Sequence, residues 1–273
     1  MGNIIDGKAA AAFIKEQIKK YVKPGTTLTI FQAGDNPASN VYVRNKQRAC
    51  EEVGIESNVI KVETPEELRN KIIVQEPFCD AMMVQLPLPE EFGDPQQYID
   101  LIPPEKDADC LTTHNLGKLF LGDMSLTPCT AKGIIHLLDE ENIEIKGKHA
   151  VVVGRSDIVG KPIAHMLLEK DATVTVCHSK TENLSEFTRM ADILIVAIGK
   201  PKFITEDMVK EGVVIIDVGI NRMEDGKLCG DVDFDAVKEK ASAITPVPGS
   251  VGPMTVSMLL ANSIYCAEVE NNE

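Results

Sequence analysis

The chain has 273 residues, of which 44% are hydrophobic and 26% charged, and its formal net charge is −14. This composition is typical of a soluble globular protein with one large or two medium domains, and its acidity disfavours a nucleic-acid partner because a phosphate backbone would be repelled. No apolar run approaches the roughly 18 residues that a membrane span needs, and the seven cysteines form no C-x-x-C pair, so we expect no membrane partner, reduced cytoplasmic thiols and no metal site.

Strands and helices alternate along the first third of the chain. A Thr-Pro-Glu-Glu stretch at 64–67 combines a capping box with a proline at the first helical position, so it predicts the start of a helix. The alternation predicts an α/β fold with mostly parallel sheets. The other elements expected in this part are helices over residues 8–22 and 39–53 and strands over residues 27–32, 58–62 and 80–85.

Three polar side chains in this part are candidates for chemistry. Tyr42 and Lys46 are four residues apart on the helix predicted over 39–53, so they share a face, and such a pair can stack on a flat substrate and move protons. Taken alone, the pair favours a core aromatic and a solvated lysine. Gln85 ends the strand over 80–85, where ligands bind in open α/β sheets; otherwise it is bonded to a neighbouring loop.

Residues 90–128 are rich in Pro, Asp and Gly and poor in periodic pattern, so we expect a long functional loop and the domain junction there. Asp109 lies in this stretch. Its carboxylate could bind the N–H and amino groups of a planar heterocycle, although the local sequence favours a helix cap or a surface charge. A helix is predicted over residues 130–138.

Residues 149–162 (HAVVVGRSDIVGKP) predict a phosphate-binding site. An apolar strand ends at Gly154, and a helical pattern begins after Gly160, so the first free N–H groups of that helix favour an anion. The spacing departs from G-x-G-x-x-G because Ser156 stands at the second glycine. The alternative is an ordinary strand-to-helix turn.

The next strand, over residues 172–177, indicates which dinucleotide binds. An NAD site usually has Asp or Glu about 20 residues past the glycines, at the end of this strand. Here His178, Ser179 and Lys180 follow the strand instead, and together with Arg155 they could meet a 2′-phosphate, which favours NADP. Individually, His178 is equally well a loop histidine and Lys180 a solvated surface charge.

The remaining elements complete the predicted dinucleotide domain. Strands are expected near residues 194 and 215, and the turn cluster 245–253 either wraps a nicotinamide or forms a rigid interdomain turn. A last helix over 254–269 is expected to pack back on the first domain. The predicted domains are therefore residues 1–125 plus 254–273 for the substrate and residues 126–253, of Rossmann type, for NADP, with a cleft between them.

Many ordered motifs across nearly the whole chain resemble the bifunctional methylenetetrahydrofolate dehydrogenase/cyclohydrolase family. The motifs are GDNPASNVYVRNK (34–46), VQLPLP (84–89), PPEKDAD (103–109), TPCTAKG (127–133), VGRSDIVGKP (153–162), TVCHS (175–179) and TPVPGSVGPMT (245–255).

The resemblance implies a function and a site. It implies NADP-dependent oxidation of 5,10-methylenetetrahydrofolate to 5,10-methenyltetrahydrofolate, hydrolysis of that product to 10-formyltetrahydrofolate, and a homodimer that joins through its dinucleotide domains. Lys46 matches the catalytic lysine, Tyr42 the tyrosine that stacks on the folate, Gln85 the glutamine that supports the lysine, and Asp109 the aspartate that binds the pterin. The expected NADP-binding residues are Gly154, Arg155, Ser156, Gly160, His178, Ser179 and Ile220.

Three positions depart from the family pattern. Cys110 and Ser250 each replace a glycine, and Ala131 replaces a proline. Ser250 bears on the turn before the last helix, because glycine reaches positive φ and serine seldom does. Three other functions stay open: a monofunctional dehydrogenase, a non-catalytic NADP-binding sensor and a shikimate-dehydrogenase-like oxidoreductase.

Overall fold

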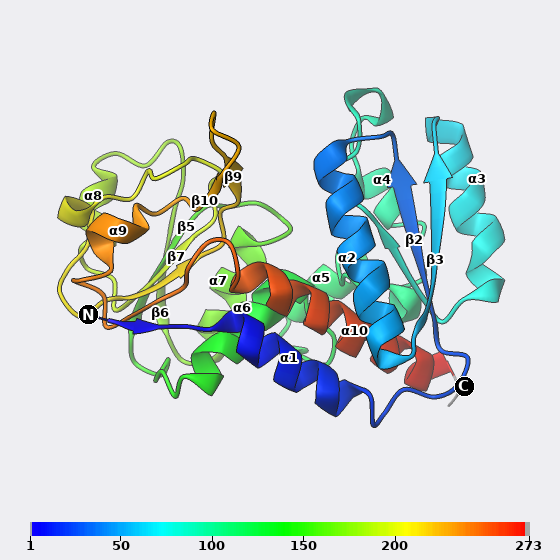
Figure 1. Ribbon diagram of the computed structural model, residues 1–273, viewed down its shortest axis with the longest axis horizontal. Coiled ribbons are helices and arrows are strands. Elements are labelled where there is room, and N and C mark those ends of the chain that lie inside the picture. The colour runs from blue at the N-terminus through cyan, green and yellow to red at the C-terminus, as the bar shows by residue number, and fades with distance from the viewer. Residues whose placement is uncertain (1, 271–273) are drawn as a thin grey trace. The chain divides into compact units, whose positions relative to one another are not determined.

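The computed structural model describes residues 2–270, without the side chains of Ala38 and Glu270, and the chain forms two compact units (Figure 1). Unit 1 takes in the N-terminus as far as Ala11 and the segment Thr130–Thr255, and unit 2 takes in Ala12–Cys129 and the chain from Val256 on. The two-domain α/β prediction is confirmed. Residues 1 and 271–273 of the predicted substrate domain lie outside the described residues.

The N-terminal segment belongs to a different unit from the one that the sequence predicts. Strand β1 (Asn3–Ile4) pairs in parallel with β11 (Ala243–Ile244), the last strand of unit 1. The predicted boundaries place residues 1–11 with the substrate domain. A two-residue strand leaves no alternating pattern, and its partner lies at the far end of the sequence, so local reasoning could not find this pairing.

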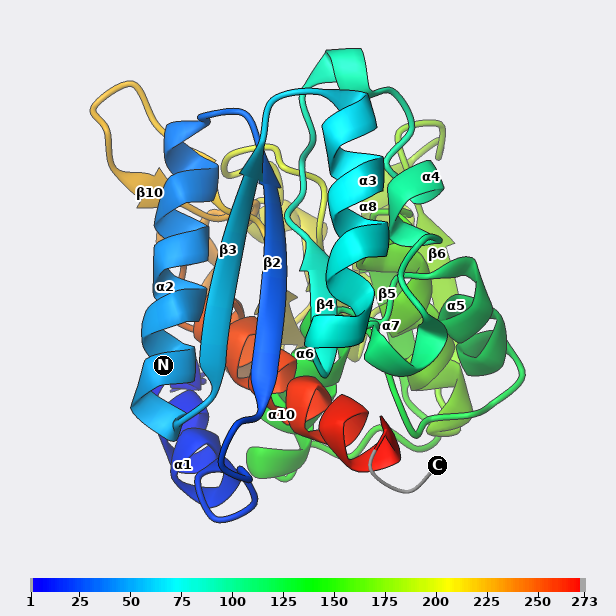
Figure 2. The same cartoon turned by 90° about the vertical axis from the view of Figure 1, so that its right-hand side faces the viewer.

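Unit 2 is built on a parallel sheet with the strand order β3-β2-β4, and one helix covers each face. Helix α2 lies against one face and α3 against the other (Figures 1 and 2). Both faces of the central strand β2 are therefore buried: every residue from Leu28 to Ala33 is buried, including the polar Thr29 and Gln32. The elements are β2 (Thr27–Ala33), α2 (Pro37–Val53), β3 (Glu56–Val62), α3 (Pro65–Gln75) and β4 (Ala81–Val84).

The predicted capping box starts α3. Thr64 Oγ1 accepts a hydrogen bond from the Glu67 backbone N–H at 3.2 Å, and Pro65 occupies the first helical position. The Glu67 carboxylate accepts in return from the backbone N–H of Glu63, one residue before the cap, at 2.9 Å. One orphan donor of the helix, the Glu67 N–H, is thus satisfied by the predicted cap residue, and the return bond goes to Glu63 and not to Thr64.

The stretch expected to be a long loop contains short regular elements. Thr112 Oγ1 caps helix α5 by accepting from the Asn115 backbone N–H at 3.2 Å. Elements of three to eight residues are too short to show a helical period, which is why the sequence looked irregular. They are η2 (Glu90–Phe92), α4 (Gln96–Ile99), η3 (Pro104–Lys106) and α5 (Thr113–Phe120).

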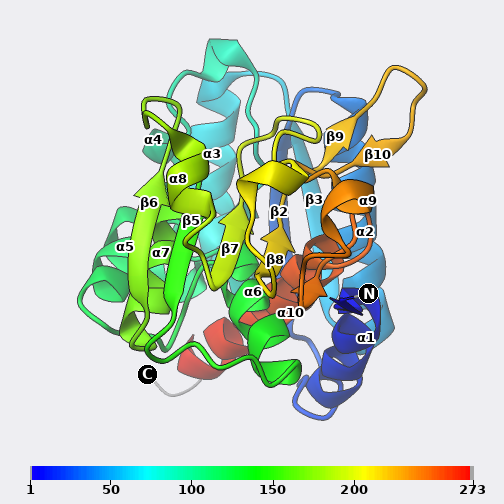
Figure 3. The same ribbon diagram turned by 90° about the vertical axis from the view of Figure 1, so that its left-hand side faces the viewer.

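Unit 1 contains a fully parallel sheet with the strand order β1-β11-β8-β7-β5-β6 (Figure 3). The chain runs from β5 outward to β6 and then returns to the other side of β5, so the strand order reverses between β5 and β7. Ligands of open α/β sheets bind beyond the carboxyl ends at such a reversal. The elements are α6 (Cys129–Glu140), β5 (His149–Val153), α7 (Gly160–Glu169), β6 (Thr173–Cys177), α8 (Leu184–Thr188), β7 (Ile193–Val196), β8 (Val214–Asp217), β9 (Asn221–Arg222), β10 (Leu228–Cys229) and α9 (Phe234–Val237).

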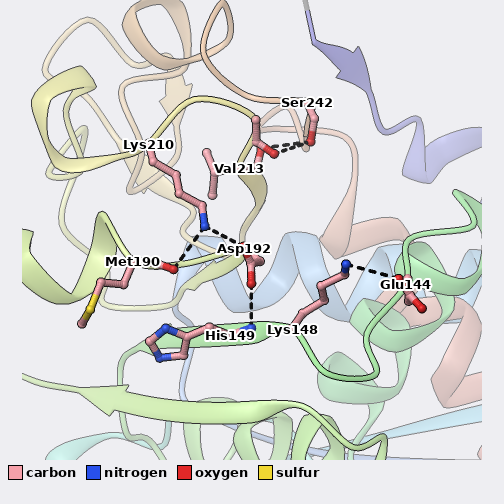
Figure 4. Close-up of polar contacts among 9 residues, drawn as sticks. Glu144, Lys148, His149, Met190, Asp192, Lys210, Val213 and Ser242 are labelled. Atoms are coloured by element: carbon pink, nitrogen blue, oxygen red, sulfur yellow. Dashed lines mark hydrogen bonds and ion pairs between the residues drawn. The ribbon is translucent and has the colours of Figure 1, made fainter.

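A carboxylate ties the strands together at the opposite, amino end of this sheet (Figure 4). Asp192 accepts hydrogen bonds from the His149 backbone N–H at 2.8 Å and from Lys210 Nζ at 2.5 Å. The hydrogen bond from Lys210, followed by the one from His149, lowers the pKa of Asp192. Lys210 also donates to the Met190 carbonyl at 3.3 Å, so the starts of β5 and β7 are held in register.

Helix α10 (Val251–Glu270) begins three residues before the predicted start. None of the described helices has the length and apolar character needed to cross a membrane. Within residues 2–270, no three His, Cys, Asp or Glu side chains gather into a metal-binding group.

Candidate active site

The site in unit 2 forms where one face of α2 meets the end of β4. Tyr42 and Lys46 are one helical turn apart, so they lie on the same face of α2. Met83 and Gln85 are two residues apart along the strand direction, so their side chains point to the same side of the sheet and contact Lys46. Lys46 Nζ lies 3.0 Å from Gln85 Oε1 and 3.4 Å from Met83 Sδ. Lys46 is only 8% exposed. Lys46 is therefore buried with its amine held by Gln85, and it is not the solvated lysine that the pattern of Tyr42 and Lys46 alone favours.

Gln85 is itself held in place. Its backbone N–H donates to the Phe31 carbonyl at 2.8 Å, and its side-chain Nε2 donates to the Leu86 carbonyl at 2.5 Å. With Nε2 engaged there, Oε1 is left to accept from Lys46, whose ammonium can only donate. The predicted bond of Gln85 to a loop is present at the Leu86 carbonyl, and Gln85 also contacts Lys46; its role at a ligand site stays a prediction.

Solvent exposure falls along this face of α2, from Tyr42 through Lys46 to Cys50. Tyr42, one turn before Lys46, keeps 37% of its surface exposed, and partial burial raises the pKa of its hydroxyl. Cys50, one turn after Lys46, is fully buried, and burial raises the pKa of its thiol to about 12 although the Lys46 charge opposes this. A ligand can therefore reach this face from the Tyr42 end, while Cys50 stays an unreactive thiol behind the lysine.

The loop that carries Asp109 is tied to β4. The Ala108 backbone N–H donates to the Met82 carbonyl at 3.1 Å. The buried Asp107 accepts from the Thr112 backbone N–H at 2.8 Å and from Asn115 Nδ2 at 3.0 Å; burial raises its pKa, and these hydrogen bonds oppose the rise. Asp109 is half-buried and makes no hydrogen bond or ion pair with another described residue, so its carboxylate is available to a ligand.

Asp107 was not predicted as a site residue. Its signal was only the doubled acidic pattern in PPEKDAD, which does not distinguish the anchoring carboxylate from the available one. Cys110 takes a left-handed conformation with φ of 57°. That explains why glycine suits this position. The buried Cys110 thiol donates to the carbonyl of Leu126, 16 residues further along the chain, at 3.3 Å.

The glycines of the predicted nucleotide site leave no room for side chains. Gly154 has φ of +129°, and a Cβ there would lie 2.3 Å from the Ala197 carbonyl oxygen. A Cβ at Gly160 would lie 2.4 Å from the Gly154 carbonyl oxygen. The start of α7 thus packs directly on the turn after β5, which is the close approach that a pyrophosphate site requires. Ser156 Oγ accepts from the Val159 and Gly160 N–H groups at 3.3 Å each.

Polar groups follow β6 beside this turn. The Lys180 backbone N–H donates to His178 Nδ1 at 3.1 Å, so a neutral His178 carries its proton on Nε2. The His178 backbone N–H donates to Thr181 Oγ1 at 2.9 Å, which fixes the turn. Ser179, Lys180 and Arg155 are exposed. Residues 178–180, directly after β6, offer donors and no carboxylate, which fits a phosphate group, and the carboxylate of Asp157 in the neighbouring turn is paired with Lys161.

Ile220 follows β8 at the same carboxyl edge of the sheet and keeps 41% of its surface exposed. Its Cδ1 lies within 3.8 Å of where a Cβ on Gly252 would stand, so the side chain lies beside the start of α10. An exposed isoleucine at this edge can pack against a flat ring.

Ser250 does not create the backbone conflict that the sequence suggested. The described residues with positive φ include Gly249 but not Ser250. The Ser250 side chain is buried, and its Oγ has no hydrogen-bond partner among the described residues. Serine in place of glycine therefore causes no backbone strain here, but it buries a hydroxyl group without a hydrogen bond among the described residues, which lowers the stability of the fold.

Replacing Ser250 with alanine is expected to stabilise the protein. Removing an unsatisfied buried hydroxyl should raise the free energy of unfolding by about 1 kcal/mol, which corresponds to a midpoint of thermal unfolding roughly 2–4 °C higher. Ser263→Ala is the matched control, because Ser263 Oγ donates to the Leu259 carbonyl at 2.8 Å. Calorimetry that showed no gain for Ser250→Ala, or the same gain for both variants, would contradict this account.

Two family models match the chain. The tetrahydrofolate dehydrogenase/cyclohydrolase catalytic domain matches residues 5–109, and the NAD(P)-binding domain of the same family matches residues 128–271. The bifunctional protein FolD of Halalkalibacterium halodurans is 51% identical over 278 aligned positions, which cover 97% of this chain and 98% of that protein.

Solved structures agree over the full length. The bifunctional FolD methylenetetrahydrofolate dehydrogenase/cyclohydrolase of Campylobacter jejuni has a TM-score of 0.95 at 44% identity and covers 99% of this chain and all of that one. The Trypanosoma brucei methylenetetrahydrofolate dehydrogenase-cyclohydrolase, solved with NADP and an inhibitor, has a TM-score of 0.94 at 36% identity, covering 100% of this chain and 99% of that one.

Proposed function

Because the chain belongs to the tetrahydrofolate dehydrogenase/cyclohydrolase family, we propose that the residues described above carry out the two reactions of that family. The protein is a bifunctional enzyme. It oxidises 5,10-methylenetetrahydrofolate with NADP⁺ to 5,10-methenyltetrahydrofolate and hydrolyses this product to 10-formyltetrahydrofolate, in one-carbon metabolism. The observation that best supports the residue assignment is the buried contact of Lys46 with Gln85 in the segment that the catalytic-domain model matches.

The folate is bound by residues of unit 2. The exposed ring of Tyr42 offers a stacking surface for the pterin, and the carboxylate of Asp109, which has no partner among the described residues, offers two acceptors for its ring N–H and amino group. The assignment thus uses the aromatic ring of Tyr42 for stacking and the carboxylate of Asp109 for hydrogen bonding.

The nucleotide is bound by residues of unit 1. When bound, NADP⁺ accepts the hydride from the methylene carbon of the folate. Gly154 and Gly160 let the start of α7 pack directly on the turn after β5, and the pyrophosphate lies at this helix start, where the helix dipole favours an anion. Arg155, Ser156, His178 and Ser179 supply donors for the phosphates, and Ile220 packs against the ring system.

The hydrolytic step depends on Lys46. Water adds to the amidinium carbon of the methenyl cation and loses a proton, and the ring then opens to the formyl product. Lys46 Nζ assists these proton transfers, and Gln85 Oε1 fixes its position at 3.0 Å. Lys46 and Gln85 are both present and in contact, which supports a bifunctional enzyme over a monofunctional dehydrogenase. A non-catalytic sensor would need neither residue.

Selectivity for NADP⁺ over NAD⁺ tests the nucleotide assignment. We expect wild-type kcat/KM to favour NADP⁺, and Arg155→Ala to reduce that preference about tenfold or more, because a charge-assisted contact to the 2′-phosphate is lost. The KM for the folate serves as the internal control and should not change. Equal use of the two nucleotides by the wild-type enzyme would show that the residues after β5 and β6 do not bind the 2′-phosphate.

The quaternary state and location follow from the family resemblance. The protein is a homodimer that joins through its nucleotide-binding unit, and it works in the cytoplasm. Light scattering of the purified protein should give twice the chain mass of 29.8 kDa. A particle of single-chain mass at working concentration would rule out the dimer.

A further inference from the structure

A buried carboxylate lies under the carboxyl edge of the unit 1 sheet. Asp231 is 0% exposed. Its Oδ2 accepts from the backbone N–H groups of Ile198 at 2.7 Å and Gly199 at 2.9 Å, and its Oδ1 accepts from the Lys200 N–H at 2.8 Å and from Asn221 Nδ2 at 2.8 Å. Three successive N–H groups that converge on one point form an anion-binding nest. Here the protein fills that nest with its own carboxylate.

A second buried carboxylate holds the first. Asp217 ends β8, is 3% exposed, and accepts from the backbone N–H groups of Gly219 at 3.0 Å, Asp231 at 3.0 Å and Val232 at 2.9 Å. Burial raises the pKa of Asp217 to about 6, and the neighbouring Asp231 charge adds to the rise, while the three hydrogen bonds oppose it. Asp217 therefore fixes the backbone from which Asp231 projects.

Two glycines show how closely the pair is packed. A Cβ on Gly219 would lie 2.2 Å from Asp231 Cγ, and a Cβ on Gly230 would lie 1.8 Å from Asp217 Oδ2. The backbone on both sides thus lies directly against the carboxylates. Burying two carboxylates is costly unless their oxygens are fully hydrogen-bonded. Here the donors are mostly backbone N–H groups of loops, which are not used in hydrogen bonds between strands.

The loops held by the two carboxylates lie at the carboxyl ends of the strands, where a dinucleotide binds. Residues 198–200 follow β7 and residues 219–221 follow β8, and because the strands are parallel both loops lie at the edge that carries Gly154 and His178. In a Rossmann-type sheet the adenosine half of the dinucleotide lies over β5 and β6, and the other half lies across the reversal point, over β7 and β8.

We propose that Asp231, supported by Asp217, is a positioning residue for NADP that presets the two loops under the nicotinamide half of the cofactor. Asp231 touches no ligand itself; it acts through the backbone of 198–200 and through Asn221, next to Ile220. This inference rests on the proposed function, since it assumes that NADP binds at this edge.

Asp231→Asn is the test variant. An amide has one oxygen, so at least one N–H group of the nest would face an NH₂ group and the loop would shift. We expect the Kd for NADPH, measured by fluorescence titration, to rise about tenfold or more. The Kd for 2′,5′-ADP, a probe of the adenosine half alone, should stay within about twofold of wild type.

Asp192→Asn is the matched control. Asp192 also accepts a backbone N–H in the same unit, but at the opposite edge of the sheet (Figure 4). It should lower the thermal midpoint and leave both Kd values unchanged. Should Asp231→Asn fail to fold, Asn221→Ala removes a single donor to Asp231 and should weaken NADPH binding about threefold without changing 2′,5′-ADP binding.

The possible failures are distinguishable. Unchanged NADPH affinity in a folded Asp231→Asn or Asn221→Ala protein, equal loss for NADPH and 2′,5′-ADP, or the same loss in Asp192→Asn would overturn the positioning role. A wild-type protein that binds neither NADPH nor 2′,5′-ADP would instead overturn the proposed function.

Discussion

Replacing Lys46 with methionine is expected to lower the cyclohydrolase kcat by about 10²–10⁴, the range that a positioned proton-transfer group contributes. Methionine has a similar length and shape, so it can fill the buried space beside Met83 without a large cavity. The variant lacks the amine that Gln85 Oε1 holds at 3.0 Å. Hydrolysis of methenyltetrahydrofolate, followed by the loss of its absorbance, measures the effect.

The same variant should keep its nucleotide affinity, because the residues assigned to NADP lie in unit 1. Arg48→Met is the matched control: Arg48 lies on the same helix, its side chain is 81% exposed, and it forms an ion pair with Glu52 on the surface of unit 2. It should keep both activities. A Lys46→Met enzyme with full cyclohydrolase activity would show that Lys46 is not the proton-transfer group.

The second large effect is expected for Gly154→Ala, which should reduce dehydrogenase kcat/KM for NADP⁺ by more than about 10²-fold. The added methyl group meets the Ala197 carbonyl oxygen at 2.3 Å, in a backbone conformation that side chains rarely adopt. The turn after β5 must then move, and a shift of about 1 Å at the reacting geometry is enough for such a loss. Steady-state kinetics with varied NADP⁺ measure it.

Gly226→Ala separates the clash from the backbone strain. Gly226 has φ of +82°, but a Cβ there meets nothing within 4 Å. This control should cost some stability and leave the KM for NADP⁺ unchanged. Hydrolysis of methenyltetrahydrofolate should persist in Gly154→Ala, because Lys46 and Gln85 belong to unit 2. Wild-type use of NADP⁺ by Gly154→Ala would mean that the cofactor does not approach this turn.

Features encoded by neighbouring residues were predictable from the sequence. The α/β class, the strand-turn-helix at 149–162 and the shared face of Tyr42 and Lys46 follow from periods of two and 3.6 residues. The family resemblance added the roles of Gln85 and Asp109, which local patterns leave open. The structure brings Lys46 and Gln85 into contact; the roles of all these residues stay predictions.

Features made by distant segments were not predictable. Asp231 binds backbone groups more than 30 residues away, and β1 pairs with a strand at the other end of the chain. No local pattern distinguishes a carboxylate that fills a nest from one on the surface. The short helices between residues 90 and 128 were not predicted for a similar reason. They are stabilised by capping contacts and burial, and they are too short to show a helical period in the sequence.

The most direct test mixes the wild-type protein with 5,10-methylenetetrahydrofolate and NADP⁺ and follows NADPH and methenyltetrahydrofolate absorbance together, with NAD⁺ in a parallel reaction. Formation of NADPH without accumulation of the methenyl compound is the predicted result, because one chain then performs both steps. Accumulation of methenyltetrahydrofolate in step with NADPH, or turnover with NAD⁺ alone, would contradict the account.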